Sequence, residues 1–124
     1  MNSKLIIQDI MKNKFVQGYI ECLLWSSTDE NNDSMDSKYS IDDFSEGALS
    51  QINKDCETFI KRAGALLDSI DAGLAGHDFW LTRNGHGCGF WSRGTGFTGD
   101  RLTKISKSFC SLDPYVGDDG KLYL

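Results

Sequence analysis

The residues that could do chemistry gather in one stretch of the chain, HDFWLTRNGHGCGFWSRGTGFTG, which runs from 77 to 99. It holds both histidines and two of the three tryptophans, together with Asp78, Cys88 and two arginines. Histidine, cysteine and aspartate bind metals or act as nucleophile and base. Tryptophan and arginine instead stack on ligands or anchor partners. Both kinds of site are therefore considered for this stretch.

The spacing inside the stretch predicts a β-hairpin. Residues 77–83 alternate in character, residues 88–93 are rich in aromatics, and the Asn-Gly pair between them is typical of a tight hairpin turn. A loop of two residues (84–85) and a loop of four (84–87) place the same side chains on the same face of the hairpin. The four-residue loop places Trp80 opposite Trp91 and Asp78 opposite Arg93 on one face.

This face predicts a contact surface for a partner protein or a small nucleotide-like ligand, because aromatic rings rimmed by hydrogen-bonding groups suit both. The alternative is that both tryptophans pack under a helix, with their indole N–H groups satisfied internally. The candidate contact residues are Asp78, Trp80, Thr82, Arg83, Asn84, His86, Trp91 and Arg93.

Metal binding and catalysis are less favoured. In the hairpin His77 begins a strand and His86 lies in the turn, so they do not converge with Cys88 as zinc ligands must. Cys88 is expected on the apolar face, where burial opposes reactivity. The chain has no C-x-x-C pair, phosphate-binding loop or nucleophile elbow. We expect no catalytic residue, metal or cofactor, and keep a small enzyme or metal-dependent hydrolase using His77, Asp78 and His86 as an alternative.

The charge of −5 is unevenly distributed. Residues 26–57 hold nine Asp or Glu and two Lys, a local charge of −7, while each flank carries +1. The negative balance disfavours direct nucleic-acid binding. The polar stretch 26–41 predicts a mobile acidic loop that serves as a solvated linker. A further alternative makes residues 26–46 an acidic mimic of DNA.

Apolar spacing predicts three helices around the hairpin. The first covers residues 4–25 with a break at Asn13. The second is long, begins after the N-cap Ser45 and ends at Gly73. The third covers residues 100–110.

The C-terminal residues predict a second hairpin around the Asp118–Asp119–Gly120 turn. The expected fold class is α+β: three helices, one of them long and central, packed on a small antiparallel sheet made of two hairpins. Residues 1–124 are expected to form a single domain.

We expect a cytoplasmic protein without a membrane partner. Lys12 and Lys14 interrupt the apolar residues near the start, and no apolar run reaches the length of a membrane span. Cys22, Cys56 and Cys110 fall on apolar helical stripes, where free thiols behave as small hydrophobes. The sequence leaves the oligomeric state undetermined, so that an oligomer is possible.

Three segments carry a resemblance to a known family: GYIECLLWSSTDE (18–30), AGHDFWLTRNGHGCGFWSRG (75–94) and YVGDDGKLYL (115–124). They resemble a widespread family of small acidic proteins of tailed bacteriophages, with an HDFWLTRNGHGxGFW block and a YVGDDGK ending. Cys88 stands where the family pattern has alanine, which weakens a thiol mechanism further. The resemblance implies a phage origin, expression in the host bacterial cytoplasm and an accessory role.

The leading hypothesis is a small phage-encoded accessory binding protein that catalyses no reaction. It would engage a host protein or sequester a nucleotide-like ligand, and could thereby counter host defence.

Overall fold

The computed structural model describes residues 3–86 and 88–124, which are mostly helical. The described residues form five α-helices and, after them, two antiparallel strands, β1 and β2; short 3-10 turns lie between the helices from α2 onward. The elements are α1 (Ser3–Ile10), α2 (Lys14–Ser26), η1 (Met35–Ser37), η2 (Ile41–Asp43), α3 (Glu46–Ala63), η3 (Gly64–Leu67), α4 (Ala72–Arg83), η4 (Phe90–Ser92), α5 (Phe97–Lys107), β1 (Tyr115–Val116) and β2 (Leu122–Tyr123). The expected fold of three helices on a sheet of two hairpins is therefore wrong.

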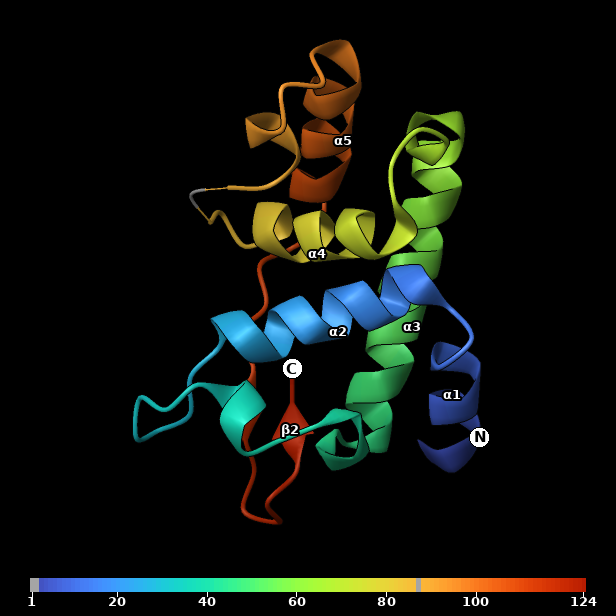
Figure 1. Ribbon diagram of the computed structural model, residues 1–124. Helices are drawn as coiled ribbons and strands as arrows, with labels where there is room; N and C mark the ends of the chain where they lie inside the picture. Colours follow the sequence, from blue (N-terminus) through green and yellow to red (C-terminus); the bar gives the residue numbers. More distant parts are fainter. Residues whose placement is uncertain (1–2, 87) are drawn as a thin grey trace.

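The helices cross one another rather than covering a sheet. Figure 1 shows α2 and α4 running side by side in the same direction across α3, with α5 above α4 and α1 beside the lower half of α3. The C-terminal hairpin lies below α2. None of the helices in the described ranges is long and apolar enough to cross a membrane.

The stretch expected to form the first hairpin is α4 and the loop that follows it. Asp71 caps the helix, because its Oδ2 accepts a hydrogen bond from the backbone N–H of Leu74 at 3.0 Å. Residues 78–83 are buried without exception, so this half of the helix has no solvent-exposed face. The one-sided apolar spacing that marks a surface helix is therefore missing, and the remaining alternation mimics a strand.

The Asn-Gly pair ends this helix instead of turning a hairpin. Gly85 has a φ of 71°, and its N–H donates to the carbonyl of Thr82 at 3.2 Å. The N–H of His86 donates to the carbonyl of Leu81 at 3.0 Å. These two bonds define a Schellman cap, which favours glycine at the same place as a tight hairpin turn does. Gly87, part of the four-residue version of the turn, lies outside the described residues.

Two glycines, Gly18 and Gly76, allow α2 and α4 to come into backbone contact. A Cβ atom on Gly18 would lie 2.0 Å from the carbonyl oxygen of Gly73. A Cβ atom on Gly76 would lie 1.9 Å from the carbonyl oxygen of Phe15. Both distances are far shorter than van der Waals contact, so only glycine permits this approach at the two positions.

An aromatic cluster forms the core between these helices and α3. The rings of Phe59 and Phe79 stack at 4.2 Å between centroids, with Phe15 and Phe90 beside them. All four side chains are buried. Burial and ring contacts of this kind contribute much of the stability of a domain this small.

Several local predictions are confirmed. Asn13 separates α1 from α2, and its Oδ1 accepts from the backbone N–H groups of Phe15 and Val16. Ser45 caps α3 by accepting from the N–H of Ala48 at 3.1 Å. The C-terminal hairpin is also present.

The end of the long helix was placed too late. α3 ends at Ala63, and Gly64 follows with a φ of 51°. The 3-10 turn η3 then continues the apolar side chains toward the core, which is why their spacing looks like further helix. Gly73 lies inside α4 and does not stop α3.

Residues 26–41 hold more local structure than a solvated linker requires. Thr28 and Ser34 form an antiparallel bridge, and Met35 is fully buried. Asp29 accepts from the N–H groups of Asn31 and Asp33, at 2.9 and 3.0 Å. The mobility of this segment stays a prediction.

Candidate functional site

The two tryptophans of the expected contact face are separated. Trp80 is 1% exposed, and its indole Nε1 donates to the hydroxyl of Ser26 at 2.8 Å. Trp91 is 52% exposed on η4. The shared hairpin face is therefore wrong, because Trp80 is a core residue of α4 and cannot stack on a ligand.

Asp78 and Arg93, expected to lie opposite each other, are in contact. The guanidinium of Arg93 donates from Nε to Oδ2 at 3.0 Å and from Nη2 to Oδ1 at 2.8 Å. Asp78 is almost fully buried, and its hydrogen bonds raise the pKa of Arg93 above its ordinary value. The pair holds the loop after η4 against α4, so the Asp78 carboxylate is occupied.

Two further candidates have structural partners. Thr82 is buried, and its hydroxyl accepts from the backbone N–H of Phe90 at 3.2 Å. Asn84 donates from Nδ2 to the carbonyl of Trp80 at 2.9 Å and accepts from the N–H of Leu112 at 2.7 Å. These bonds anchor the loops around the end of α4.

Arg83 is a buried link between α4, α2, α3 and the chain after α5. It donates to the carbonyl of Cys110 at 2.6 and 3.0 Å, to the Tyr19 hydroxyl at 3.1 Å and to Asp55 at 2.9 Å. Its guanidinium also lies over the Phe109 ring at 5.3 Å. Burial raises the pKa of Tyr19 far above its ordinary value, so its hydroxyl stays neutral. Arg83 stabilises the fold and is not accessible to a partner.

The two histidines lie on different elements. His86 is exposed beyond the end of α4, whereas His77 lies on α4 itself. The Nδ1 of His77 is buried, lacks a hydrogen-bond partner among the described residues and lies 3.9 Å from Oδ1 of Asp78. In residues 3–86 and 88–124, no group of three or more His, Cys, Asp or Glu side chains is arranged to hold a metal ion.

The cysteines depart from two expectations. Cys88 and Cys110 are exposed, although both were expected on apolar faces. Cys22 and Cys56 are buried as expected. Burial, with a smaller effect of the nearby Asp78 carboxylate, raises the pKa of the Cys22 thiol to about 12. This thiol is therefore neutral at ordinary pH.

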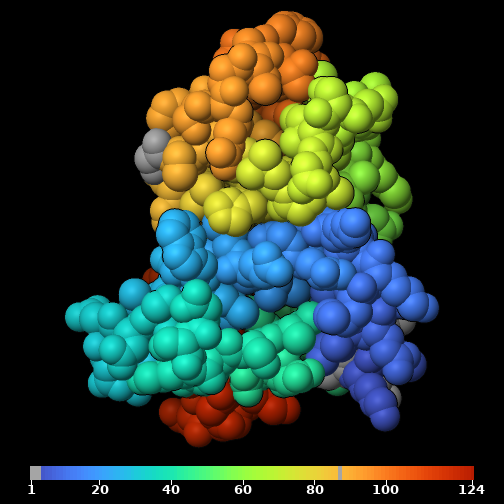
Figure 2. Space-filling view, in the orientation of Figure 1, coloured from blue at the N-terminus to red at the C-terminus, as the bar shows by residue number. Residues whose placement is uncertain are grey.

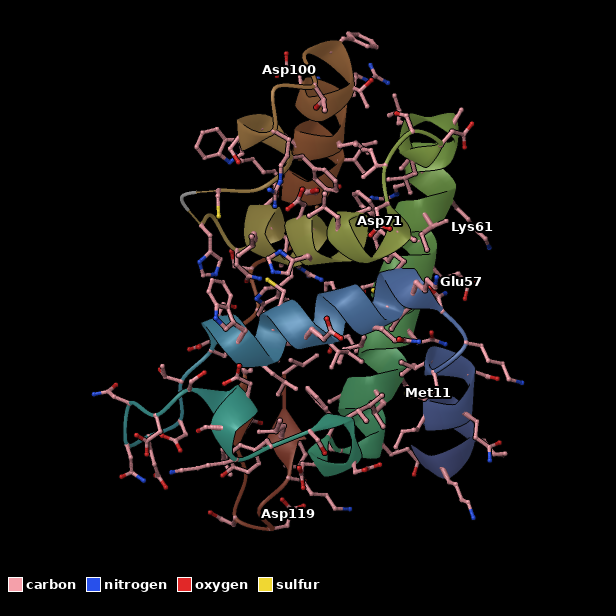
Figure 3. The ribbon with its side chains drawn as sticks, viewed as in Figure 1. Met11, Glu57, Lys61, Asp71, Asp100 and Asp119 are labelled. Carbon is pink, nitrogen blue, oxygen red and sulfur yellow. The ribbon has the colours of Figure 1, made fainter. Side chains whose placement is uncertain are left out.

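Two hollows flank the outward side of α4, which lies next to α2 across the middle of the face shown in Figure 2. One, of about 480 Å³, lies between α2 and α4 and is lined in part by His77. The other, of about 280 Å³, lies between α4 and the loop that carries Arg93. Asp71 and Leu74 line both hollows and form the ridge between them. Figure 3 shows Asp71 at the start of α4.

An exposed tryptophan extends this ridge. Trp25, at the end of α2, is 61% exposed, and its ring centroid lies 6.1 Å from that of His77. We use the name α4 surface for the set Trp25, Asp71, Leu74, His77 and Arg93.

Of the α4 surface, only Arg93 was predicted as a contact residue. Trp25, Asp71 and Leu74 were missed, and His77 was considered only for the enzyme alternative. A helical interpretation of residues 71–77 would have found part of it, because positions 71, 74 and 77 repeat at the three-residue spacing of one side of a helix. Trp25 gave no such signal, since its place beside His77 depends on the packing of α2 on α4.

The chain matches no protein-family model, no curated protein and no solved structure. The likeness to tailed-phage proteins therefore stays a prediction from the segments quoted above.

Proposed function

We propose that this chain is a small phage-encoded accessory protein that binds a protein of the bacterial host through the α4 surface and catalyses no reaction. The observation that carries the proposal is the exposed Trp25 ring, which lies beside His77, a residue that lines the hollow between α2 and α4. Tryptophan and arginine supply much of the binding energy at protein interfaces, and the α4 surface presents Trp25 and Arg93. The phage and host parts of the proposal are supported by the resemblance alone.

A protein partner fits this surface better than a nucleotide-like ligand. Small-molecule sites enclose most of their ligand in one cavity. Here the exposed groups are spread over α2, α4 and the loop after η4, with two separate hollows between them. The stacking platform expected for a nucleobase is lost, because Trp80 is buried.

The other two hypotheses have less support. The hydrolase reading needs a free Asp78 carboxylate, but both oxygens accept hydrogen bonds from Arg93. The DNA-mimic reading needs free carboxylates in residues 26–46. Lys38 binds two of them, Asp29 and Asp33, each at 2.9 Å.

The proposal is tested by immobilising the chain and passing bacterial lysate over it, in parallel with the variants Trp25→Ala and Leu74→Ser. Phe97→Ala is the matched control, because Phe97 is 72% exposed and lies on α5, outside the α4 surface. A host protein retained by the wild type and the control, and lost with both variants, supports the proposal. With the purified partner, Trp25→Ala should weaken binding roughly 30-fold, as removal of an interface hot spot does.

Two outcomes contradict the proposal. One is that no host protein is retained at low or moderate salt, which contradicts the proposal of a host partner. The other is a nucleotide that stabilises the wild type but not Trp25→Ala, because the surface would then bind a small ligand and not a protein.

A further inference from the structure

A third hollow, with a different chemistry from the two beside α4, lies between the last turn of α3 and α5. It has a volume of about 300 Å³ and is lined by Arg62, Arg101, Lys104, Ile105 and Ser108. Three of these five side chains are cationic and none is acidic. In a chain of net charge −5, this is a local concentration of positive charge. The hollow shares no residue with the α4 surface.

In the part of the chain that the structure describes, the three cations lack a carboxylate partner. Within residues 3–86 and 88–124, no acidic side chain lies within salt-bridge distance of Arg62, Arg101 or Lys104. The neighbouring Lys61 does not belong to the cluster, since it pairs with Glu57 at 3.4 Å and points away from α5 in Figure 3.

Contacts with neutral groups hold the arginines in place. Nη1 of Arg62 donates to the Ser108 hydroxyl at 3.2 Å, and its guanidinium lies 5.3 Å from the centroid of the Phe109 ring. The guanidinium of Arg101 lies 5.9 Å from the centroid of the Phe97 ring. These contacts use little of the donor capacity of either arginine. Side chains held in this way lose less conformational entropy when an anion binds.

Helix dipoles account for only part of the cluster. Arg62 and Lys104 lie in the last turns of α3 and α5, where a cation is favourable. Arg101 lies in the second turn of α5, outside the last turn in which the dipole favours a cation. The convergence of all three on one hollow therefore needs another reason.

We propose that this hollow binds the phosphate groups of a small phosphorylated molecule, with a diphosphate as the smallest ligand that uses all three cations. The planar guanidinium groups of Arg62 and Arg101 would donate to phosphate oxygens, and Lys104 would add a third charge. One carboxylate would neutralise only one of the three cations. A long polyanion such as a nucleic acid is disfavoured by the acidic remainder of the chain.

Calorimetric titration of the full chain with inorganic pyrophosphate tests this site, with ionic strength held constant by sodium chloride. We expect saturable binding to one site and a melting temperature that rises with pyrophosphate concentration. Arg101→Gln and Lys104→Gln should each weaken binding about tenfold, the effect of losing one charge-assisted hydrogen bond. Lys54→Gln removes the same charge from the exposed side of α3 and should leave the affinity unchanged.

Two results would overturn the proposal. One is a signal that does not saturate, or that changes equally in Arg101→Gln and Lys54→Gln, because it reflects general charge screening. The other is tighter binding of a polyglutamate peptide than of pyrophosphate with the same sensitivity to Arg101→Gln, because the site would then take an acidic protein segment. Circular dichroism of each unliganded variant separates lost binding from lost folding, and Lys104→Gln decides the question if Arg101→Gln does not fold.

Discussion

Asp78 and Arg93 form a two-point ion pair that fastens the loop after η4 to the middle of α4. The two hydrogen bonds measure 2.8 and 3.0 Å, and the Asp78 side chain is 1% exposed while that of Arg93 is 41% exposed. A carboxylate this deeply buried depends on its partner to offset the loss of hydration. Because Arg93 keeps part of its own hydration, the desolvation of its guanidinium costs less free energy than that of the buried carboxylate.

The first prediction follows from this asymmetry. Arg93→Leu leaves a buried carboxylate without its partner and should lower the free energy of unfolding by about 2 kcal/mol, less than for a fully buried pair because Arg93 is partly exposed. The double variant Asp78→Asn/Arg93→Leu should be more stable than Arg93→Leu alone, since no charge remains buried. Urea denaturation of the wild type, the two single variants Asp78→Asn and Arg93→Leu, and the double variant measures this. A double variant as unstable as the sum of the single changes contradicts it.

The contact between Asp78 and Arg93 was predicted from the sequence, but within a β-hairpin and not between a helix and the loop that returns to it. A hairpin and a helix followed by a returning loop can both bring these two positions together. The choice depends on the environment of residues 78–83, whose burial on all sides removes the helical pattern. Elements with one polar side, such as α3, show their periodicity in the sequence, and α3 was predicted with its correct N-cap.

The α4 surface could be predicted only in part, for a different reason. It depends on the contact that brings α2 beside α4, which Gly18 and Gly76 permit. Glycine in a helix is unfavourable on local grounds, so the sequence around Gly18 does not by itself indicate a helix contact. Only the position of the second helix gives these glycines their role.

The second prediction tests this helix contact. Gly76→Ala places a methyl group 1.9 Å from the Phe15 carbonyl oxygen, so α2 and α4 must separate. The variant should lose about 3 kcal/mol of stability, the upper range for overpacking. Gly47→Ala is the control, because its Cβ would meet no atom within 4 Å in α3. That change should stabilise the protein by roughly 0.5 kcal/mol, since alanine is the better helix former. Equal melting temperatures for the two variants would disprove the close contact.

The third prediction concerns Arg83, whose donors bind groups on three other segments. Arg83→Met keeps much of the apolar stem but leaves the Cys110 carbonyl and Asp55 without this partner. We expect a loss of about 3 kcal/mol. Asp55→Asn should cost about 1 kcal/mol, because the Asp55 side chain is 20% exposed. Thermal denaturation measures both. Arg101→Met, at an exposed position, is the control and should change stability by less than about 0.5 kcal/mol.

The fourth prediction concerns the pH dependence of the 26–41 segment. The Asp29 carboxylate accepts hydrogen bonds from Lys38 and from two backbone N–H groups, and these lower its pKa below the ordinary 3.8. A carboxyl whose pKa is lower in the folded state contributes stability above its unfolded pKa and loses it as the pH falls through the folded value. Asp29→Asn should therefore destabilise the protein at pH 6, and the difference from the wild type should shrink below pH 4. Urea titrations at both pH values measure this, and a difference that grows in acid contradicts it.

The last prediction separates the four cysteines by reactivity. Cys88 and Cys110 are exposed, whereas Cys22 and Cys56 are buried, and burial raises the pKa of both buried thiols. With a pKa of about 12, Cys22 has a thiolate fraction on the order of 10⁻⁴ at pH 8. A disulfide reagent at pH 8 should therefore modify two thiols rapidly and the other two only as the protein unfolds. Addition of guanidinium chloride provides the control, since all four thiols must then react at similar rates. Mass spectrometry of digested protein assigns the sites, and rapid labelling of Cys22 in the folded chain would show that α2 and α4 separate far more readily than their glycine contact implies.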